Sequence, residues 1–171
     1  MKKQLSAIKG ELRQVASPAK AVILSSFFKT GKGQYGEGDL FLGVVVPTQR
    51  LIAKKHINAT FGVVESLLQS KYHEERFTGL LILLYQFKKA KDELTRKNIY
   101  DFYLGHSSKV NNWDLVDVSC RDIVGSYLAN KKRTVLYNLA KSSNMWERRI
   151  AIVSTMHFIL QGDCVDALAL S

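Results

Sequence analysis

A chain of 171 residues is long enough to bury a hydrophobic core, and its 46% of hydrophobic residues excludes a wholly disordered protein. The longest apolar run, Leu80 to Tyr85, is too short to cross a bilayer as a helix. The formal net charge of +10 attracts polyanions, so we consider nucleic acid first and an acidic membrane surface second. A generally basic soluble surface is the plain alternative.

The cysteines and histidines indicate neither a disulfide framework nor a metal site. Cys120 and Cys164 form no CxxC pair, and two isolated cysteines are typical of a reducing, cytoplasmic compartment. The basic N-terminus lacks the apolar segment of a secretory signal. The histidines are scattered singly at His56, His73, His106 and His157. We therefore expect a cytoplasmic protein that binds no metal and no cofactor.

Two helices are predicted at the N-terminus. Apolar residues recur every three or four positions from Leu5 to Val15, which indicates an amphipathic first helix. Ser17 followed by Pro18 marks the start of a second helix, because serine caps helices and proline favours their first position. We expect the buried stripe of this second helix to consist of Val22, Ile23 and Phe27.

A glycine-rich segment, residues 29–46, follows the second helix. It contains a literal GxGxxG from Gly31 to Gly36, but a dinucleotide-binding fingerprint needs a strand before it and a helix directly after it. Here a helix precedes the glycines, and no βαβ unit surrounds them. We therefore predict a loop between helices, in which Lys29 and Lys32 contact phosphates.

The rest of the chain reads as helices joined by short turns. Pro47 is predicted to open a third helix with Leu51 and Ile52 on its inner side. Later apolar faces are formed by Phe77, Leu80, Leu81 and Leu84, and by Trp146, Ile150, Val153, His157 and Leu160. A histidine on such a stripe indicates a core residue rather than a ligand. No segment alternates apolar and polar residues as a strand does, so the chain is predicted to be all-α.

An internal repeat indicates how these helices are arranged. Residues 67–76 align with residues 139–148, and the Trp–acid pair of Trp113 and Asp114 recurs at Trp146 and Glu147. This recurrence is typical of stacked helix pairs of the HEAT or armadillo type. We predict that residues 1–171 form one helical-repeat domain, an α-α superhelix, and we leave its oligomeric state open.

Trp113 and Asp117 are the best candidates for chemistry, because a spacing of four places them on one side of a helix. The alternative is structural: Trp113 fills a seam between repeats, and Asp117 bonds a neighbouring helix end. Arg148 and Arg149 follow Trp146, and Arg149 is expected on the same side as that indole. In so basic a chain we expect the two arginines to bind phosphate, with a solvated face as the alternative.

Three segments of the chain are distinctive: FFKTGKGQYGEGD at 27–39, NNWDLVD at 111–117 and WERRIAIVST at 146–155. Together they resemble the DNA alkylation repair family of AlkD-type DNA glycosylases, and the resemblance extends from residue 5 to the C-terminus. It implies a HEAT-like solenoid whose basic concave face grips double-stranded DNA. It also implies excision of alkylated, positively charged purines such as 7-methylguanine and 3-methyladenine.

The resemblance also implies roles for single residues. Asp117 would be the catalytic carboxylate, and Trp113 an aromatic wall against the damaged nucleotide. Arg149 would hold a backbone phosphate near the lesion, and Phe27 would be an aromatic contact. Alkylation makes the purine a cationic leaving group, and its departure leaves an oxocarbenium-like sugar that a carboxylate stabilises while positioning water. Little acid catalysis is needed, which agrees with the lack of a second acid beside Asp117.

Members of this family continue through further helical pairs that carry a second functional tryptophan. We therefore expect this chain to be a truncated form or an array that ends early, with one wall of the lesion site missing. Two functions of other classes stay open as alternatives. One is a non-catalytic helical-repeat module that binds nucleic acid, and the other is a protein-interaction scaffold.

Overall fold

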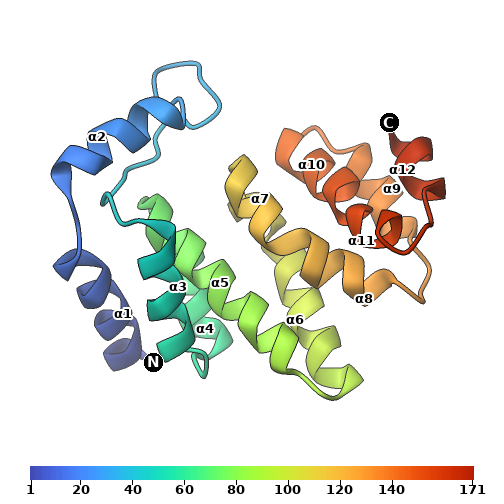
Figure 1. Cartoon of the computed structure of the whole chain (residues 1–171), viewed down its shortest axis with the longest axis horizontal. Coiled ribbons are helices and arrows are strands. Elements are labelled where there is room, and N and C mark those ends of the chain that lie inside the picture. The colour runs from blue at the N-terminus through green and yellow to red at the C-terminus, as the bar shows by residue number, and fades with distance from the viewer. The chain divides into compact units, whose positions relative to one another are not determined.

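The computed structural model describes residues 1–171; its regular elements are all helices, and it has no strand (Figure 1). One isolated bridge pairs Leu40 with Tyr72. The all-α fold class predicted from the sequence is confirmed. The chain divides into two compact units, an N-terminal unit of Met1–Gln86 and a C-terminal unit of Phe87–Ser171, which are described in turn. The organisation as one repeat domain stays a prediction.

The N-terminal unit is built around the first part of a long buried helix. Its helices are α1 (Lys2–Gln14), α2 (Pro18–Phe27), α3 (Val46–Lys55), α4 (Phe61–Leu68) and the start of α5 (His73–Lys89). Ile8 and Leu12 of α1 are fully buried, as the predicted periodicity requires, and α1 packs against α3 and α4. The apolar residues of α5 from Phe77 to Leu84 are buried as well.

Helix α2 begins where the sequence indicates, but its apolar residues do not face a core. The Ser17 hydroxyl accepts a hydrogen bond from the Lys20 N–H at 3.4 Å, which confirms the predicted cap. The predicted buried stripe is wrong: Val22, Ile23 and Phe27 are 72%, 66% and 59% exposed, and α2 contributes no buried residue. Periodicity identifies the helix, but no other element covers this face of it.

Helix α3 corrects a second prediction. Leu51 is 67% exposed, whereas Ile52 is buried as expected. The inner side of α3 consists of Gln49, Ile52 and Ala53, which lie at helical spacing from one another. Leu51 falls one position outside this stripe, so its side chain faces outward.

The C-terminal unit is a series of shorter helices. They are α6 (Glu93–Gly105), the 3-10 turn η1 (Ser107–Lys109), α7 (Trp113–Cys120), the π-helical turn η2 (Arg121–Gly125), α8 (Ser126–Leu128), α9 (Thr134–Ala140), α10 (Met145–Ser154), α11 (Met156–Ile159) and α12 (Val165–Leu170). The backbone stays helical from α7 through η2 into α8. Helix α10 packs most extensively against α9 and α7.

The apolar face predicted from residue 146 to residue 160 is correct only in its first half. Trp146 and Ile150 are buried, but the helix breaks after Ser154 and Leu160 is 72% exposed. His157, beyond the break, is only half-buried rather than a core residue, and its burial lowers its pKa. Its Nε2 atom lies 3.1 Å from the side-chain nitrogen of Gln161.

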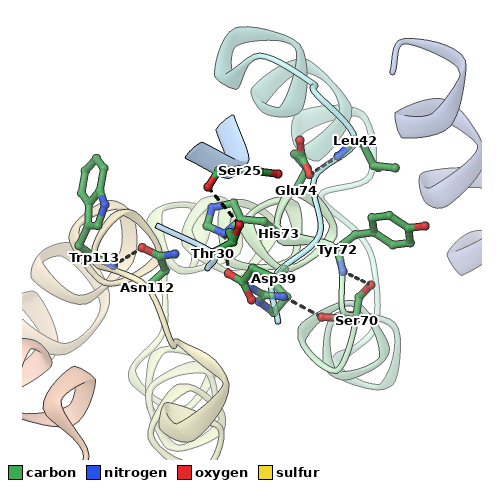
Figure 2. Close-up of polar contacts among 11 residues, drawn as sticks. Ser25, Thr30, Asp39, Leu42, Ser70, Tyr72, His73, Glu74, Asn112 and Trp113 are labelled. Atoms are coloured by element: carbon green, nitrogen blue, oxygen red, sulfur yellow. Dashed lines mark hydrogen bonds and ion pairs between the residues drawn. The ribbon is translucent and has the colours of Figure 1, made fainter. Parts of the chain in front are cut away.

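The predicted alignment of residues 67–76 with 139–148 has an atomic basis in the two turns that it covers. Ser70 and Ser142 each accept, on the hydroxyl, the backbone N–H two residues later at 3.1 Å (Figure 2 shows the Ser70 bond). The carbonyls of the same two serines accept bonds from Arg76 at 2.9 Å and Arg148 at 2.8 Å. The α4–α5 and α9–α10 pairs are therefore joined by the same kind of turn.

Candidate functional site

Helix α7 places Trp113 and Asp117 on one side, as predicted. The buried side chain of Asn112 caps the helix, and its Oδ1 accepts the Trp113 N–H at 2.8 Å (Figure 2). Trp113 is the first residue of the helix and is half-buried, while Asp117 lies one turn later and is exposed. The cap fixes Trp113 as the first residue of α7, and helical spacing then places Asp117 on the same face.

Helix α10 begins with an equivalent asparagine cap. The Asn144 Oδ1 accepts the Trp146 N–H at 2.9 Å. Trp146 is therefore the second residue of its helix and is buried, whereas Trp113 is the first residue of α7. The predicted match between the two tryptophans is wrong by one residue. When the caps are aligned, the residue five positions after each asparagine is Asp117 in α7 and Arg149 in α10.

These two equivalent residues form the central ion pair of the site. Arg149 donates from Nε to Oδ1 of Asp117 at 2.9 Å and from its NH2 group to Oδ2 at 2.7 Å. This two-point geometry matches the planar guanidinium to the planar carboxylate. The hydrogen bond with Asp117 is the main cause of the raised pKa of Arg149. Both residues were predicted site residues, and the structure brings them together.

The ion pair is accessible and therefore easy to exchange. The side chains of Asp117 and Arg149 are 37% and 40% exposed. An exposed pair of this kind contributes only up to about 1 kcal/mol to stability. A phosphate can therefore compete for the Arg149 guanidinium at small cost, since the guanidinium carries five N–H donors and binds phosphate in the same two-point manner.

Arg148 has a different set of partners. Its NH1 group donates to the carbonyls of Ser142 at 2.8 Å and Ser143 at 2.9 Å. Both carbonyls belong to the turn between α9 and α10. The side chain is exposed, so it remains a predicted phosphate contact with an additional structural role. Arg148, Arg149 and Trp146 line a hollow of about 440 Å³ beside α10. Arg149, three residues after Trp146, lies with it along this hollow.

The remaining predicted DNA contacts lie in the N-terminal unit. Phe27 ends α2, and Lys29 and Lys32 follow it in the glycine-rich loop, all three with exposed side chains. The loop binds two of its own glycine N–H groups internally, Gly31 to Gln34 Oε1 at 2.9 Å and Gly33 to Glu37 Oε2 at 2.7 Å. It is a loop between helices, as predicted, and these N–H groups are not arranged to cradle a phosphate.

A buried polar cluster at the start of α5 was not predicted from the sequence. Asp39 Oδ2 accepts from Arg76 at 2.6 Å and lies 3.4 Å from Nδ1 of His73, while Glu74 binds the backbone of residues 42–44. Burial alone would raise the pKa of Asp39, but the His73 hydrogen bond and the Arg76 charge hold it below its usual value. The two adjacent acids that open α5 were the available signal, since acids favour a helix N-terminus.

None of the helices combines the length and the apolar character that crossing a membrane requires. No group of three or more His, Cys, Asp or Glu side chains is arranged to hold a metal ion.

Comparison with protein families places this geometry in context. The family model described as "DNA alkylation repair enzyme" matches residues 8–171, which is nearly the whole chain. Comparison with individually curated proteins gives no significant match.

Proposed function

This chain belongs to the DNA alkylation repair enzyme family, which assigns it a role in DNA repair, and from that premise we propose that it is a monofunctional DNA N-glycosylase. Its proposed substrates are alkylated cationic purines of the 7-methylguanine and 3-methyladenine type in double-stranded DNA. The observation that supports this proposal best is the Asp117–Arg149 pair, whose carboxylate is accessible and lies one helical turn from Trp113.

The proposed reaction is hydrolysis of the N-glycosidic bond. The bond breaks with its electron pair moving to the cationic purine, which leaves as a neutral base, and the positive charge passes to the sugar. The Asp117 carboxylate stabilises the oxocarbenium-like sugar and orients a water molecule, whose oxygen adds to C1′ and whose proton passes to the solvent. The purine leaves without needing a general acid because it already carries positive charge.

The other site residues act on the DNA around the lesion. The face of the Trp113 indole attracts the cationic base by about 0.5–2 kcal/mol, depending on how far water is excluded. Arg149 orients Asp117 in the free protein and exchanges part of this contact for the backbone phosphate next to the lesion. Arg148, Lys29 and Lys32 add phosphate contacts, and Phe27 adds an aromatic one, in keeping with the net charge of +10.

The proposal is tested by measuring release of 7-methylguanine from alkylated duplex DNA. We expect release by the parent chain, loss of release in Asp117→Asn, and DNA affinity close to the parent's in that variant, because the substitution removes a negative charge without removing a phosphate contact. Asp101→Asn is the matched control, since it removes an exposed acid that pairs with Lys97 on α6. This control is expected to release base at the parent rate.

The other outcomes discriminate among the functions. Unchanged release in Asp117→Asn would exclude Asp117 as the catalytic carboxylate. DNA binding without release by the parent chain would favour a non-catalytic DNA-binding module. Absence of DNA binding even at low salt would favour a protein-interaction scaffold.

A further inference from the structure

Glu74, on the first turn of α5, holds three consecutive backbone N–H groups. Its Oε2 accepts from Leu42 at 2.9 Å, and its Oε1 accepts from Gly43 at 2.8 Å and from Val44 at 3.2 Å (Figure 2 shows the Leu42 bond). The side chain is only 1% exposed. A buried carboxylate is unfavourable unless it is hydrogen-bonded, so Glu74 and the loop backbone stabilise each other.

The same stretch of loop is in direct contact with the start of α2. The Ser17 N–H donates to the Leu42 carbonyl at 2.9 Å. Gly43 has a φ of +79°, and a Cβ at this position would lie 2.1 Å from the Ser17 carbonyl oxygen and 2.7 Å from the Ala21 nitrogen. Only glycine permits both this conformation and this approach. The first turn of α2 therefore packs directly on the backbone segment that Glu74 holds.

The other end of α2 is anchored to α5 as well. Phe28 is buried, and its ring stacks on Phe41 with centroids 5.1 Å apart and lies 4.8 Å from the His73 ring. The His73 N–H donates to the Leu40 carbonyl at 2.8 Å. Because no residue of α2 is fully buried, these attachments at its two ends contribute strongly to its position.

We propose that Glu74 is a positioning residue for DNA binding: by fixing residues 42–44 it holds α2 and the loop after it, so that Phe27, Lys29 and Lys32 meet the duplex. This inference rests on the proposed function, because it assigns those three residues to DNA contact. Glu74 itself does not touch the DNA. Without its carboxylate, residues 42–44 no longer support α2, and Lys29 and Lys32 are no longer held in position.

The first test requires no DNA. Trypsin cleaves after lysine. Lys29 and Lys32 are exposed, and they lie in the loop between the buried Phe28 and residues 42–44, which Glu74 holds. In Glu74→Gln the side chain keeps one acceptor oxygen and presents N–H donors to the remaining backbone donor, so the loop is held less firmly and we expect cleavage after Lys29 and Lys32 at least several-fold faster than in the parent. Glu74→Asp keeps a carboxylate and is expected to restore part of the protection.

The second test measures duplex DNA affinity as a function of salt. Each lost phosphate contact lowers the slope of log affinity against log salt by about 0.9, so losing both lysine contacts makes the fall in affinity between 50 and 200 mM salt about tenfold smaller. Glu74→Gln and the double variant Lys29→Ala/Lys32→Ala are expected to show the same reduced slope. Combining all three substitutions should reduce the slope no further, because Glu74 acts through the lysines.

Glu75→Gln is the matched control on the same turn of α5. Glu75 is equally buried, but its carboxylate pairs with Lys9 at 2.8 Å and Arg13 at 2.9 Å rather than with the loop. We expect this variant to lose stability without faster cleavage after Lys29 or Lys32 and without a smaller salt slope. Gly43→Ala disrupts the same contact between the loop and α2 from the loop side. It is expected to show the effects predicted for Glu74→Gln, and it replaces that variant if Glu74→Gln does not fold.

Three results would overturn the inference. The first is unchanged cleavage after Lys29 and Lys32 in folded Glu74→Gln. The second is a parent-like salt slope in that variant beside a reduced slope in the double-lysine variant. The third is the same faster cleavage in Glu75→Gln. The proposed glycosylase function is judged separately by base release, which the parent chain shows or lacks whatever the outcome at Glu74.

Discussion

Gly125, in the continuous helical segment from α7 to α8, lies in close contact with the end of α10. A Cβ at this position would lie 2.3 Å from the carbonyl oxygen of Ser154 and 2.8 Å from the Cβ of His157. Ordinary contacts lie near 3.5 Å, so Gly125→Ala requires a separation of about 1 Å between the two backbones. Overpacking of this kind costs about 1–3 kcal/mol, against a gain of about 1 kcal/mol in helix propensity. We expect net destabilisation of up to about 2 kcal/mol.

Gly10→Ala provides a control of the opposite sign. Gly10 lies in the middle of α1, and a Cβ there would meet nothing within 4 Å. Since only the propensity term applies, we expect stabilisation by about 0.5–1 kcal/mol. The same substitution is therefore predicted to change stability in opposite directions in the two units.

Urea unfolding with two probes measures both effects. The two tryptophans, Trp113 and Trp146, lie in the C-terminal unit, so their fluorescence reports on the unit that contains Gly125. Gly125→Ala is expected to lower the urea midpoint seen by fluorescence, and Gly10→Ala to raise the midpoint seen by circular dichroism. A fluorescence midpoint for Gly125→Ala equal to or above that of the parent would refute the close approach at Ser154.

Two further predictions concern titratable groups. Cys120 is fully buried, and its burial raises the pKa of its thiol to about 12, whereas Cys164 is exposed. At pH 8 one equivalent of a thiol reagent should therefore react rapidly with Cys164, and the second only after unfolding. Cys164→Ser should abolish the rapid phase. Two rapid equivalents in the parent would contradict this prediction. The Asp39 carboxyl has a pKa below its usual value in the folded protein, so its contacts contribute stability above about pH 4 that is lost as the pH falls through the lowered value. Urea unfolding should thus show Asp39→Asn to be less stable than the parent at pH 7, with a difference in stability that shrinks toward pH 2. Asp101→Asn, in an exposed pair, serves as the control. A stability difference that does not depend on pH would exclude the ionic contribution.

Local features of the structure follow directly from the sequence. The Ser17–Pro18 start of α2 depends on contacts within one helical turn, and a serine followed by proline specifies them. The shared face of Trp113 and Asp117 depends only on helical spacing once α7 is recognised. The equivalent turns at Ser70 and Ser142 were detectable for the same reason, since each repeat closes its turn with its own residues.

Burial was predicted less well, because it depends on which elements cover a helix. The apolar residues of α2 have the composition of a core helix, yet Val22, Ile23 and Phe27 are exposed. The helix is positioned by its ends, through Glu74 and the loop, and these contacts join residues about thirty positions apart. Neither periodicity nor propensity carries information about such a distant anchor.

The candidate site shows the same division. The sequence by itself determined that this is a basic, all-helical chain, that Trp113 and Asp117 share a face, and that two arginines follow Trp146, because each of these properties is local or additive. Only the tertiary structure decided which arginine meets the carboxylate. Packing of α7 against α10 brings Asp117 and Arg149 together, while Arg148, one residue earlier, donates to carbonyls of the turn after α9. A rotation of about 100° between neighbouring residues of a helix separates these two roles.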